Sequence, residues 1–211
     1  CSAVGGGMLN AVVSSSYTSQ DADLTGTEQD YTALEHELRS LIENIERDHP
    51  GYDEYRYALN EIMHNPHELT ALLTALYPAY TRAEVQAELQ RIFNLQYALT
   101  LTQIVEVRYR TETRTDTWTD EEGNTHTDSY RVYYDYYICT VTLDNFNLSH
   151  LPIYIMGEEK VSRYSLYMAT LGNRPDLFPG SSYVGKYTNP PDGYEVPGEY
   201  LDDETFAAML S

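Results

Sequence analysis

Carboxylates are numerous in this chain, but their spacing does not define a catalytic site. The sequence holds 33 acidic residues, and hydrolysis of a glycosidic bond needs two carboxylates across a cleft, one of them in an apolar pocket. Glu35, Glu37 and Glu43 alternate with an apolar stripe, which is typical of the solvent-facing side of a helix. The sequence singles out no catalytic pair, although a divergent glycan hydrolase that uses one stays an alternative.

Nucleophiles and metal-ligating residues also lack the spacing that their chemistry requires. Cys139 lies inside a strand-like run, where it is expected to be a small core residue, and Cys1 lies in a tail of small residues. Neither place lowers the pKa of a thiol. His64 and His67 are separated by an Asn-Pro pair, and the chain contains no Gly-x-Ser-x-Gly, His-Glu-x-x-His or Cys-x-x-Cys motif. The sequence therefore predicts no catalytic residue and no cofactor.

Three aspartates at a predicted hairpin tip are the weak candidates for calcium ligands. Asp116, Asp120 and Asp128 lie close together in the sequence, and calcium prefers such oxygen ligands. The EF-hand template fails, because its glycine placed on Gly123 puts Trp118 at the first ligand position. A solvated, charged tip that discourages edge pairing is the favoured interpretation, so no metal site is predicted.

The charge of the chain disfavours two classes of partner. The formal net charge is -20, with 13 basic residues and no cluster of them, so the surface would repel nucleic acid and anionic lipid. No run of 18 apolar residues occurs. We expect no nucleic-acid partner, and contact with a membrane only through an anchor that precedes or includes Cys1, whose small-residue surroundings resemble a lipid-modified cysteine and its tether.

Tyrosine is unusually frequent, with 21 residues against four phenylalanines. Its flat ring and hydroxyl suit sugar or peptide surfaces, although tyrosine also favours β-strands for reasons unrelated to binding. Tyr133 and Tyr137 share one face of a predicted strand, and Tyr134 and Tyr136 share the other. These four are the candidate binding residues, and we expect one of the two faces to be core.

Hydrophobic periodicity predicts a tether followed by a helical amino half. Residues 1–26 are rich in Ser, Gly and Ala, and are expected to be flexible. Asn65 begins the strongest start signal, with a cap, a first-turn proline and a glutamate at the third position. Four helices are expected: one from Thr27 to before Pro50, one over 52–64 that buries Tyr55 and Leu59, one from Pro66 to before Pro78, and one from Thr81.

The period then changes from 3.6 to 2, which predicts strands. Strands over 100–118 and 129–143 flank a polar hairpin tip at 120–124. The later expected segments are a strand over 148–156, a helix over 158–171 ended by Gly172, a Pro/Gly-rich extended segment over 173–200, and the start of a helix over 201–211 that leads to a further domain. Residues 27–172 are thus predicted to form one α+β domain, a helical half packed on an antiparallel β-meander with a closing helix.

Several stretches resemble cell-wall hydrolases carried by conjugative transposons of Firmicutes. The runs Asn147–Met156 and Leu171–Phe178 resemble the middle region of these enzymes, and Cys1–Thr18 is similar to the stretch after their membrane anchor. Tyr200–Leu210 looks like the first helix leading into their NlpC-type cysteine peptidase domain. The peptidase's Asp-Cys-Ser-Gly motif is absent from these residues, as is the Glu-Ser motif of the lysozyme-like domain that some relatives carry here.

This resemblance implies a membrane-anchored, extracytoplasmic protein of the cell surface that opens peptidoglycan locally for a conjugation apparatus. Its implied partners are peptidoglycan or proteins of the conjugation machinery. We expect this part of the chain to be a non-catalytic positioning or binding domain of such a hydrolase. Two alternatives stay open: a divergent glycan hydrolase with a carboxylate pair, and an adaptor that docks to the conjugation machinery.

Overall fold

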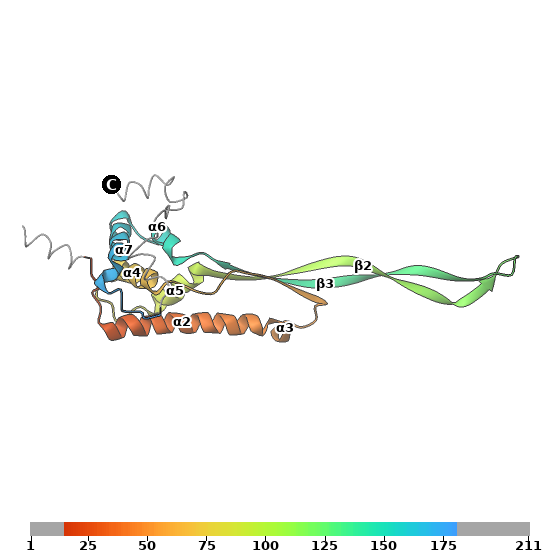
Figure 1. The fold of residues 1–211 in the computed structure, drawn as a ribbon, viewed down its shortest axis with the longest axis horizontal. Helices are drawn as coiled ribbons and strands as arrows, with labels where there is room; N and C mark the ends of the chain where they lie inside the picture. Colours follow the sequence, from red (N-terminus) through yellow and green to blue (C-terminus); the bar gives the residue numbers. More distant parts are fainter. Residues whose placement is uncertain (1–14, 181–211) are drawn as a thin grey trace, which may run out of the picture. The chain divides into compact units, whose positions relative to one another are not determined.

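The computed structural model describes residues 15–180, which form two compact units (Figure 1). The helical unit comprises residues 15–40, 61–98 and 145–180, and the ribbon unit comprises 41–60 and 99–144. The predicted α+β class is confirmed. The expected single domain over 27–172 is instead divided, because the chain alternates between the two units. Among the described residues, no helix has the length and apolar character needed to cross a membrane.

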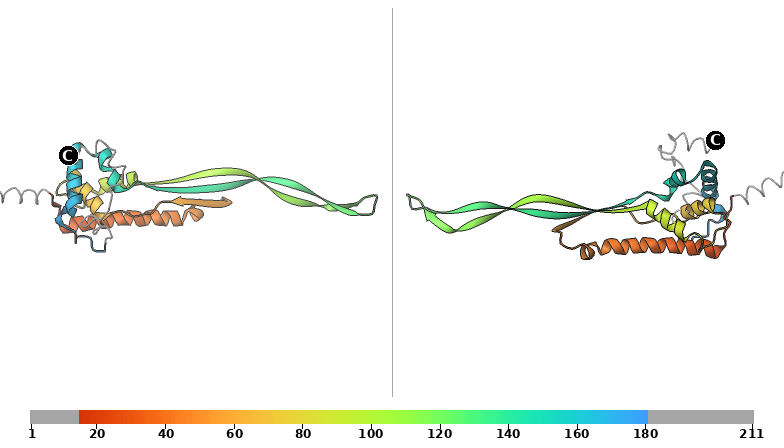
Figure 2. Two further views of the ribbon diagram at one scale, coloured as in Figure 1. Left: turned by 45° about the horizontal axis from the view of Figure 1, so that its top comes forward. Right: turned by 180° about the vertical axis from the view of Figure 1, so that it is seen from behind.

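The helical unit has a core made by helices that are distant in the sequence. Helix α4 packs against α7, as both views of Figure 2 show. The side chains that are fully buried include Tyr31, Leu69, Leu72 and Leu148. Its elements are α2 (Asp21–Glu43, which continues into the ribbon unit), α4 (Pro66–Leu76), α5 (Gln86–Gln96), η1 (Leu148–His150), α6 (Pro152–Ile155), α7 (Glu158–Thr170) and η2 (Leu171–Asn173).

Helix α4 begins where the capping signal predicted it. The Asn65 side chain accepts a hydrogen bond from the backbone N–H of His67 at 2.9 Å, and Pro66 occupies the first helical position. Nearly every residue from His67 to Ala75 is buried, which explains the apolar composition around the whole helix. The cap therefore positions the central element of the helical core.

The first residues that the structure describes pack against the end of α7. Leu171 is left-handed with φ 48°, and Gly172 follows with φ 60°. Tyr17 donates its backbone N–H to the Gly172 carbonyl at 3.2 Å, and a Cβ on Gly172 would lie 2.4 Å from the Tyr17 ring. The expected flexible tether over 1–26 is thus wrong for residues 15–26, because they pack here and then enter α2. Residues 1–14 lie outside the described part.

The ribbon unit contains a long hairpin with a third strand on one edge. Strands β2 (Tyr97–Thr119) and β3 (Thr125–Asn145) form the hairpin, and β1 (Glu54–Leu59) pairs with β3 in parallel. The strand order is β1-β3-β2. A mixed sheet therefore replaces the expected antiparallel meander. The other helix is α3 (Ile45–Asp48), and the buried residues are Ile42, Ile45, Ile138, Cys139, Val141 and Leu143.

The predicted helix over 52–64 is wrong, because its centre is the strand β1. Tyr55, Tyr57 and Leu59 alternate along the chain and pair with Cys139, Val141 and Leu143 of β3. Leu59 is 44% exposed and is not a core residue. The partner strand lies 84 positions later in the sequence, so no local pattern could show that it stabilises an extended conformation here.

Other predicted boundaries also differ from the structure, among them the helix expected from Thr81, which begins at Gln86. The expected strand over 148–156 is a 3-10 turn followed by the short helix α6, with Leu148, Leu151 and Pro152 buried at near-helical spacing. Helix α2 begins at Asp21 and not at Thr27, which is buried within the helix. The helix over 158–171 is confirmed as α7, ended by Leu171 and Gly172.

Candidate functional site

The four candidate tyrosines lie on the β2–β3 ribbon, past the last residue that pairs with β1. The parallel pairing starts at Ile138, so residues 133–137 have only β2 as a neighbouring strand. Tyr133 is 62% exposed, and Tyr134 and Tyr137 are also exposed. The expectation that one of their two faces is core is therefore wrong. A two-stranded ribbon has no second layer that could cover either face.

The cross-strand ring contacts show which residues of the ribbon share a face. The Arg108 guanidinium lies 3.5 Å from the centre of the Tyr136 ring, and Arg114 lies 5.8 Å from that of Tyr130. Near the tip, Trp118 stacks on His126 at 4.6 Å. From one pair to the next, the residue number on β3 decreases by as much as the residue number on β2 increases. The two residues of each pair therefore lie directly opposite each other in a single antiparallel register. This arginine face thus includes Arg108, Arg110, Arg114, Trp118, His126, Tyr130, Tyr134 and Tyr136, and alternation along the strands adds Glu112, Asp116, Asp128 and Val132.

The opposite face changes character along the ribbon. Val107, Tyr109 and Tyr133 are exposed, and the Tyr109 and Tyr133 rings lie 6.0 Å apart. Arg131 covers the Tyr109 ring at 4.5 Å. Nearer the tip, this hydroxyl face consists of Thr111, Thr113, Thr115, Thr117, Thr125, Thr127 and Ser129. Large apolar and aromatic side chains on a solvated ribbon are what an extended binding surface provides.

The carboxylate of Asp120 organises the hairpin tip. Its Oδ1 accepts hydrogen bonds from the backbone N–H groups of Glu122 and Asn124 at 3.0 and 2.8 Å, and its Oδ2 lies 2.6 Å from Nε2 of His126. The His126 hydrogen bond is the main reason that the pKa of Asp120 is lowered. Among residues 15–180, no group of three acidic, His or Cys side chains could hold a metal. Asp116, Asp120 and Asp128, the weak calcium candidates, are not gathered into such a group.

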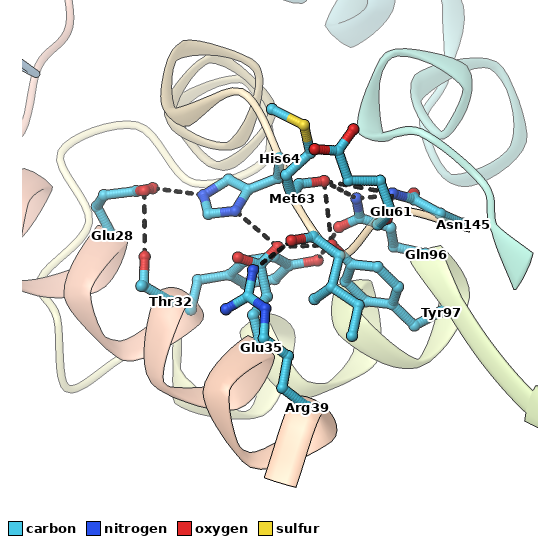
Figure 3. A network of polar contacts seen from close by, with 12 residues as sticks. Glu28, Thr32, Glu35, Arg39, Glu61, Met63, His64, Gln96, Tyr97 and Asn145 are labelled. Atoms are coloured by element: carbon cyan, nitrogen blue, oxygen red, sulfur yellow. Dashed lines mark hydrogen bonds and ion pairs between the residues drawn. The ribbon is translucent and has the colours of Figure 1, made fainter. Parts of the chain in front are cut away.

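A second cluster of polar side chains lies inside the helical unit, around His64 (Figure 3). Nδ1 of His64 lies 2.9 Å from Oε1 of Glu35, and Nε2 lies 2.8 Å from Oε2 of Glu28. The Tyr97 hydroxyl donates to the same Glu35 oxygen at 2.6 Å. The Tyr31 ring packs edge-on against the imidazole with centroids 4.7 Å apart. Two carboxylates from α2 thus hold one imidazole between them.

The cluster continues into a chain of amide hydrogen bonds. Gln96 accepts from the Tyr31 hydroxyl at 2.5 Å and donates to the Asn145 side-chain oxygen at 3.1 Å. Asn145 in turn donates to the backbone carbonyl of Glu61 at 2.8 Å, and Arg39 donates to the carbonyl of Ile62. Together these bonds join α2 to segment 61–64 and to the ends of α5 and β3 within the helical unit (Figure 3).

The His64 imidazole is protonated at neutral pH. Burial disfavours its charge and would lower its pKa, but the hydrogen bonds to Glu28 and Glu35 and the charges of those carboxylates outweigh burial. The pKa of His64 is raised from 6.5 to about 9. The side chains of His64 and Glu35 are 3% and 5% exposed, and that of Glu28 is 17% exposed. The cluster is therefore a buried ion triad in which both ring nitrogens are donors.

A cavity of about 480 Å³ lies beside this triad. Glu28 and His64 contribute to its lining, together with Thr25, Leu177 and Phe178. A general base needs a free lone pair within reach of a substrate proton. His64 has no free nitrogen, and the Glu35 carboxylate is bonded to His64 and Tyr97. The arrangement suits a structural clamp that ties α2 to the segment before α4.

The sequence pattern does not reveal the triad, because it predicts that Glu35 lies on the solvent-facing side of its helix. That prediction is wrong, since Glu35 is 3% exposed. A signal was present: Glu28, Tyr31 and Glu35 follow the 3-and-4 spacing of one buried stripe. Gln96 and Asn145 offered no comparable signal, because only the fold brings them together.

The cysteines contribute no chemistry that the structure describes. Cys139 is a buried, free thiol in β3, as the strand-like run predicted. Burial raises the pKa of its thiol, which makes it less reactive. Cys1, the anchor candidate, lies outside the described residues, and so do residues 181–211, which include most of the extended segment and the helix expected over 201–211.

Comparison of the chain with protein-family models, curated proteins and solved structures gives no match. The geometry of the ribbon and of the buried triad is therefore the basis for assigning a function.

Proposed function

We propose that this chain is a non-catalytic binding module, and that its β2–β3 ribbon is the element that binds. In line with the resemblance described above, the module would position a membrane-anchored peptidoglycan hydrolase of a conjugative element at the bacterial cell wall. The observation that carries the proposal is the exposure of large aromatic and apolar side chains along both faces of the ribbon, from Ile104 to Tyr137.

The side chains of the ribbon do not form a hydrophobic core. No residue from Ala98 to Tyr137 is buried, and Val107 is 71% exposed. An isolated pair of strands is marginally stable in water, and exposed apolar surface of this kind marks interaction sites. A ligand that covers one face would remove that surface from water and so stabilise the ribbon.

The chemistry of the arginine face suits the glycan and peptide of the cell wall. Tyrosine rings such as Tyr130 and Tyr134 present flat apolar surfaces for sugar rings, with hydroxyls for hydrogen bonds. Arg110 and Arg114 supply donors that match the carboxylates of a peptide. A twisted ribbon offers these groups in a row, which fits an extended polymer better than a compact small molecule.

The triad supports a non-catalytic role over the alternative of a glycan hydrolase. Glu28 lines the cavity and Glu35 lies behind it, but His64 is bonded to both carboxylates and occupies the space between them. An inverting or retaining mechanism needs that space for a water or a sugar carbon.

A sedimentation assay with Gram-positive sacculi tests this proposal. The purified chain is incubated with sacculi and centrifuged, the pellet is assayed for protein, and the supernatant is assayed for reducing sugars and free amines. We expect protein in the pellet and no released product. The double variant Tyr130→Ala/Tyr134→Ala should bind at least tenfold more weakly, since stacking of one ring contributes ~1 kcal/mol.

Tyr154→Ala is the matched control, because Tyr154 is 71% exposed but belongs to the helical unit. It should bind as the unchanged chain does. Release of sugar or amine would overturn the non-catalytic assignment. Protein that stays in the supernatant would overturn binding to the wall and favour the adaptor alternative.

A further inference from the structure

The outer edge of β2 is a long strand edge without a partner among the described residues. The order β1-β3-β2 places β3 in the middle of the sheet, so β2 is bonded on one side only. Proteins usually protect such an edge with proline, a bulge or a run of like charges. β2 contains neither proline nor glycine over its 23 residues, and its charged residues are of both signs.

We propose that this edge pairs with the same edge of a second copy of the chain. The two β2 strands run antiparallel about a two-fold axis at Thr113, and together the two ribbons form a four-stranded sheet. The inference goes beyond the proposed function, because it uses the backbone edge of β2, and Arg110 and Arg114 of the arginine face take part in both.

The backbone N–H and C=O groups of β2 that point to the free edge belong to the residues that this pairing brings opposite one another. Asp120 donates its N–H across the hairpin to the carbonyl of Asn124, so the even-numbered residues of β2 near it direct their N–H and C=O groups toward β3. The odd-numbered residues Thr111, Thr113 and Thr115 therefore direct theirs toward the free edge. An axis at Thr113 brings these odd residues opposite one another, so their backbone groups can bond.

In this register, charged side chains on the arginine face of one copy lie opposite side chains of opposite charge on the other copy. Glu112 of one copy lies opposite Arg114 of the other, and Arg110 lies opposite Asp116. Arg108 lies opposite Trp118, an arrangement that favours a cation–π contact. The two-fold axis makes each of these pairs occur twice. Opposite charges directly across from one another stabilise a strand pair.

Neighbouring registers lack this complementarity. Moving the axis to Glu112 places Glu112 against its own copy and Arg110 against Arg114. Moving it to Arg114 places Arg114 against its own copy and Glu112 against Asp116. Like charges directly opposite one another are destabilising. On the hydroxyl face, the Thr113 axis pairs threonine with threonine, which is favourable for cross-strand neighbours.

The edge of β2 is also where two acidic chains can approach at low electrostatic cost. The whole chain has a net charge of -20, but this strand balances three arginines, Arg108, Arg110 and Arg114, against Glu106, Glu112 and Asp116. At physiological salt the Debye length is about 8 Å, so distant charges are screened while paired charges across the edge still interact. The contact between Arg110 and Glu112 within one chain is largely exposed and can be exchanged.

A charge-swap experiment on the full chain tests whether charge pairing across the β2 edge holds the dimer together. One variant carries Arg110→Glu and Arg114→Glu, and the other carries Glu112→Arg and Asp116→Arg. Each variant alone places like charges opposite one another and should be a monomer in sedimentation equilibrium. Mixed in equal amounts, the two should form a heterodimer, because residues 110, 112, 114 and 116 of each copy then face residues of opposite charge.

Thr113→Pro tests the edge itself. It removes an N–H that points away from β3, so the ribbon stays intact while the dimer is lost. Thr127→Pro is the control, because it removes an outward N–H from the other edge of the ribbon, and it should dimerise like the unchanged chain. Three results would each overturn the proposal: an unchanged chain that is monomeric up to about 1 mM, dimerisation of the Thr113→Pro variant, or no association in the mixture.

Discussion

Nδ1 of His64 lies 2.9 Å from Oε1 of Glu35, although the two residues are 29 positions apart. This contact and its counterpart at Glu28 place a charged imidazole in the interior of the helical unit. A buried charge is tolerated only when it is paired and hydrogen-bonded, so the stability of the unit depends on this triad being complete.

We expect stability to fall as pH rises from about 6.5 to 9. The folded-state pKa of His64, about 9, is above its unfolded value of 6.5, so its contribution is fully present below pH 6.5 and is lost as pH rises through 9. The full shift corresponds to about 3 kcal/mol. Urea unfolding at pH 6.5 and pH 9.5 measures the loss, and in His64→Gln the stability should be nearly constant over this range. An equal loss in that variant would contradict the assignment.

Removing either carboxylate should destabilise the protein, with Glu35 the more costly. Glu35→Gln leaves a buried imidazolium with one anionic partner and should cost about 3 kcal/mol. Glu28 is more exposed, so Glu28→Gln should cost about 1 kcal/mol, because water can replace part of the lost interaction. Denaturant midpoints at pH 7 give both values. Equal costs, or a reversed order, would show that burial does not control the triad.

Gly172→Ala should cost about 3 kcal/mol, from two causes. Its φ of 60° is unfavourable for alanine, and the new Cβ would lie 2.4 Å from the Tyr17 ring. Gly51→Ala separates the causes, because Gly51 also has a positive φ but has open space around its Cβ, so that variant should cost only about 1 kcal/mol. The two free energies of unfolding should differ; if they do not, residues 15–18 do not pack against the end of α7.

Shortening the hairpin should leave the rest of the chain folded. Replacing residues 109–135 by Asn-Gly joins the opposed residues Arg108 and Tyr136, whose backbone groups point toward each other, through a two-residue turn. No buried residue is removed, so the free energy of unfolding should change by less than about 1 kcal/mol. Binding to sacculi and dimerisation should both be lost. If sacculus binding survives the deletion, the binding surface belongs to another part of the protein.

The sequence by itself determined the elements whose signals are local. The Asn65 cap and Pro66 predict where α4 starts, and the charged hairpin tip predicts the turn between β2 and β3. Gly172 predicts where α7 ends. In each case the interaction that defines the boundary joins residues a few positions apart, so the pattern is visible along the chain.

Only the tertiary structure decided the features that depend on distant partners. β1 was mistaken for a helix because its stabilising partner is β3, and Glu35 was assigned to solvent because its partners are His64 and Tyr97. The tyrosines of β3 were placed on the right strand, but the sequence could not show that both of their faces are uncovered. The physical reason is the same each time: burial and pairing are set by which segments meet in space, and the residues of one segment do not record which segments those are.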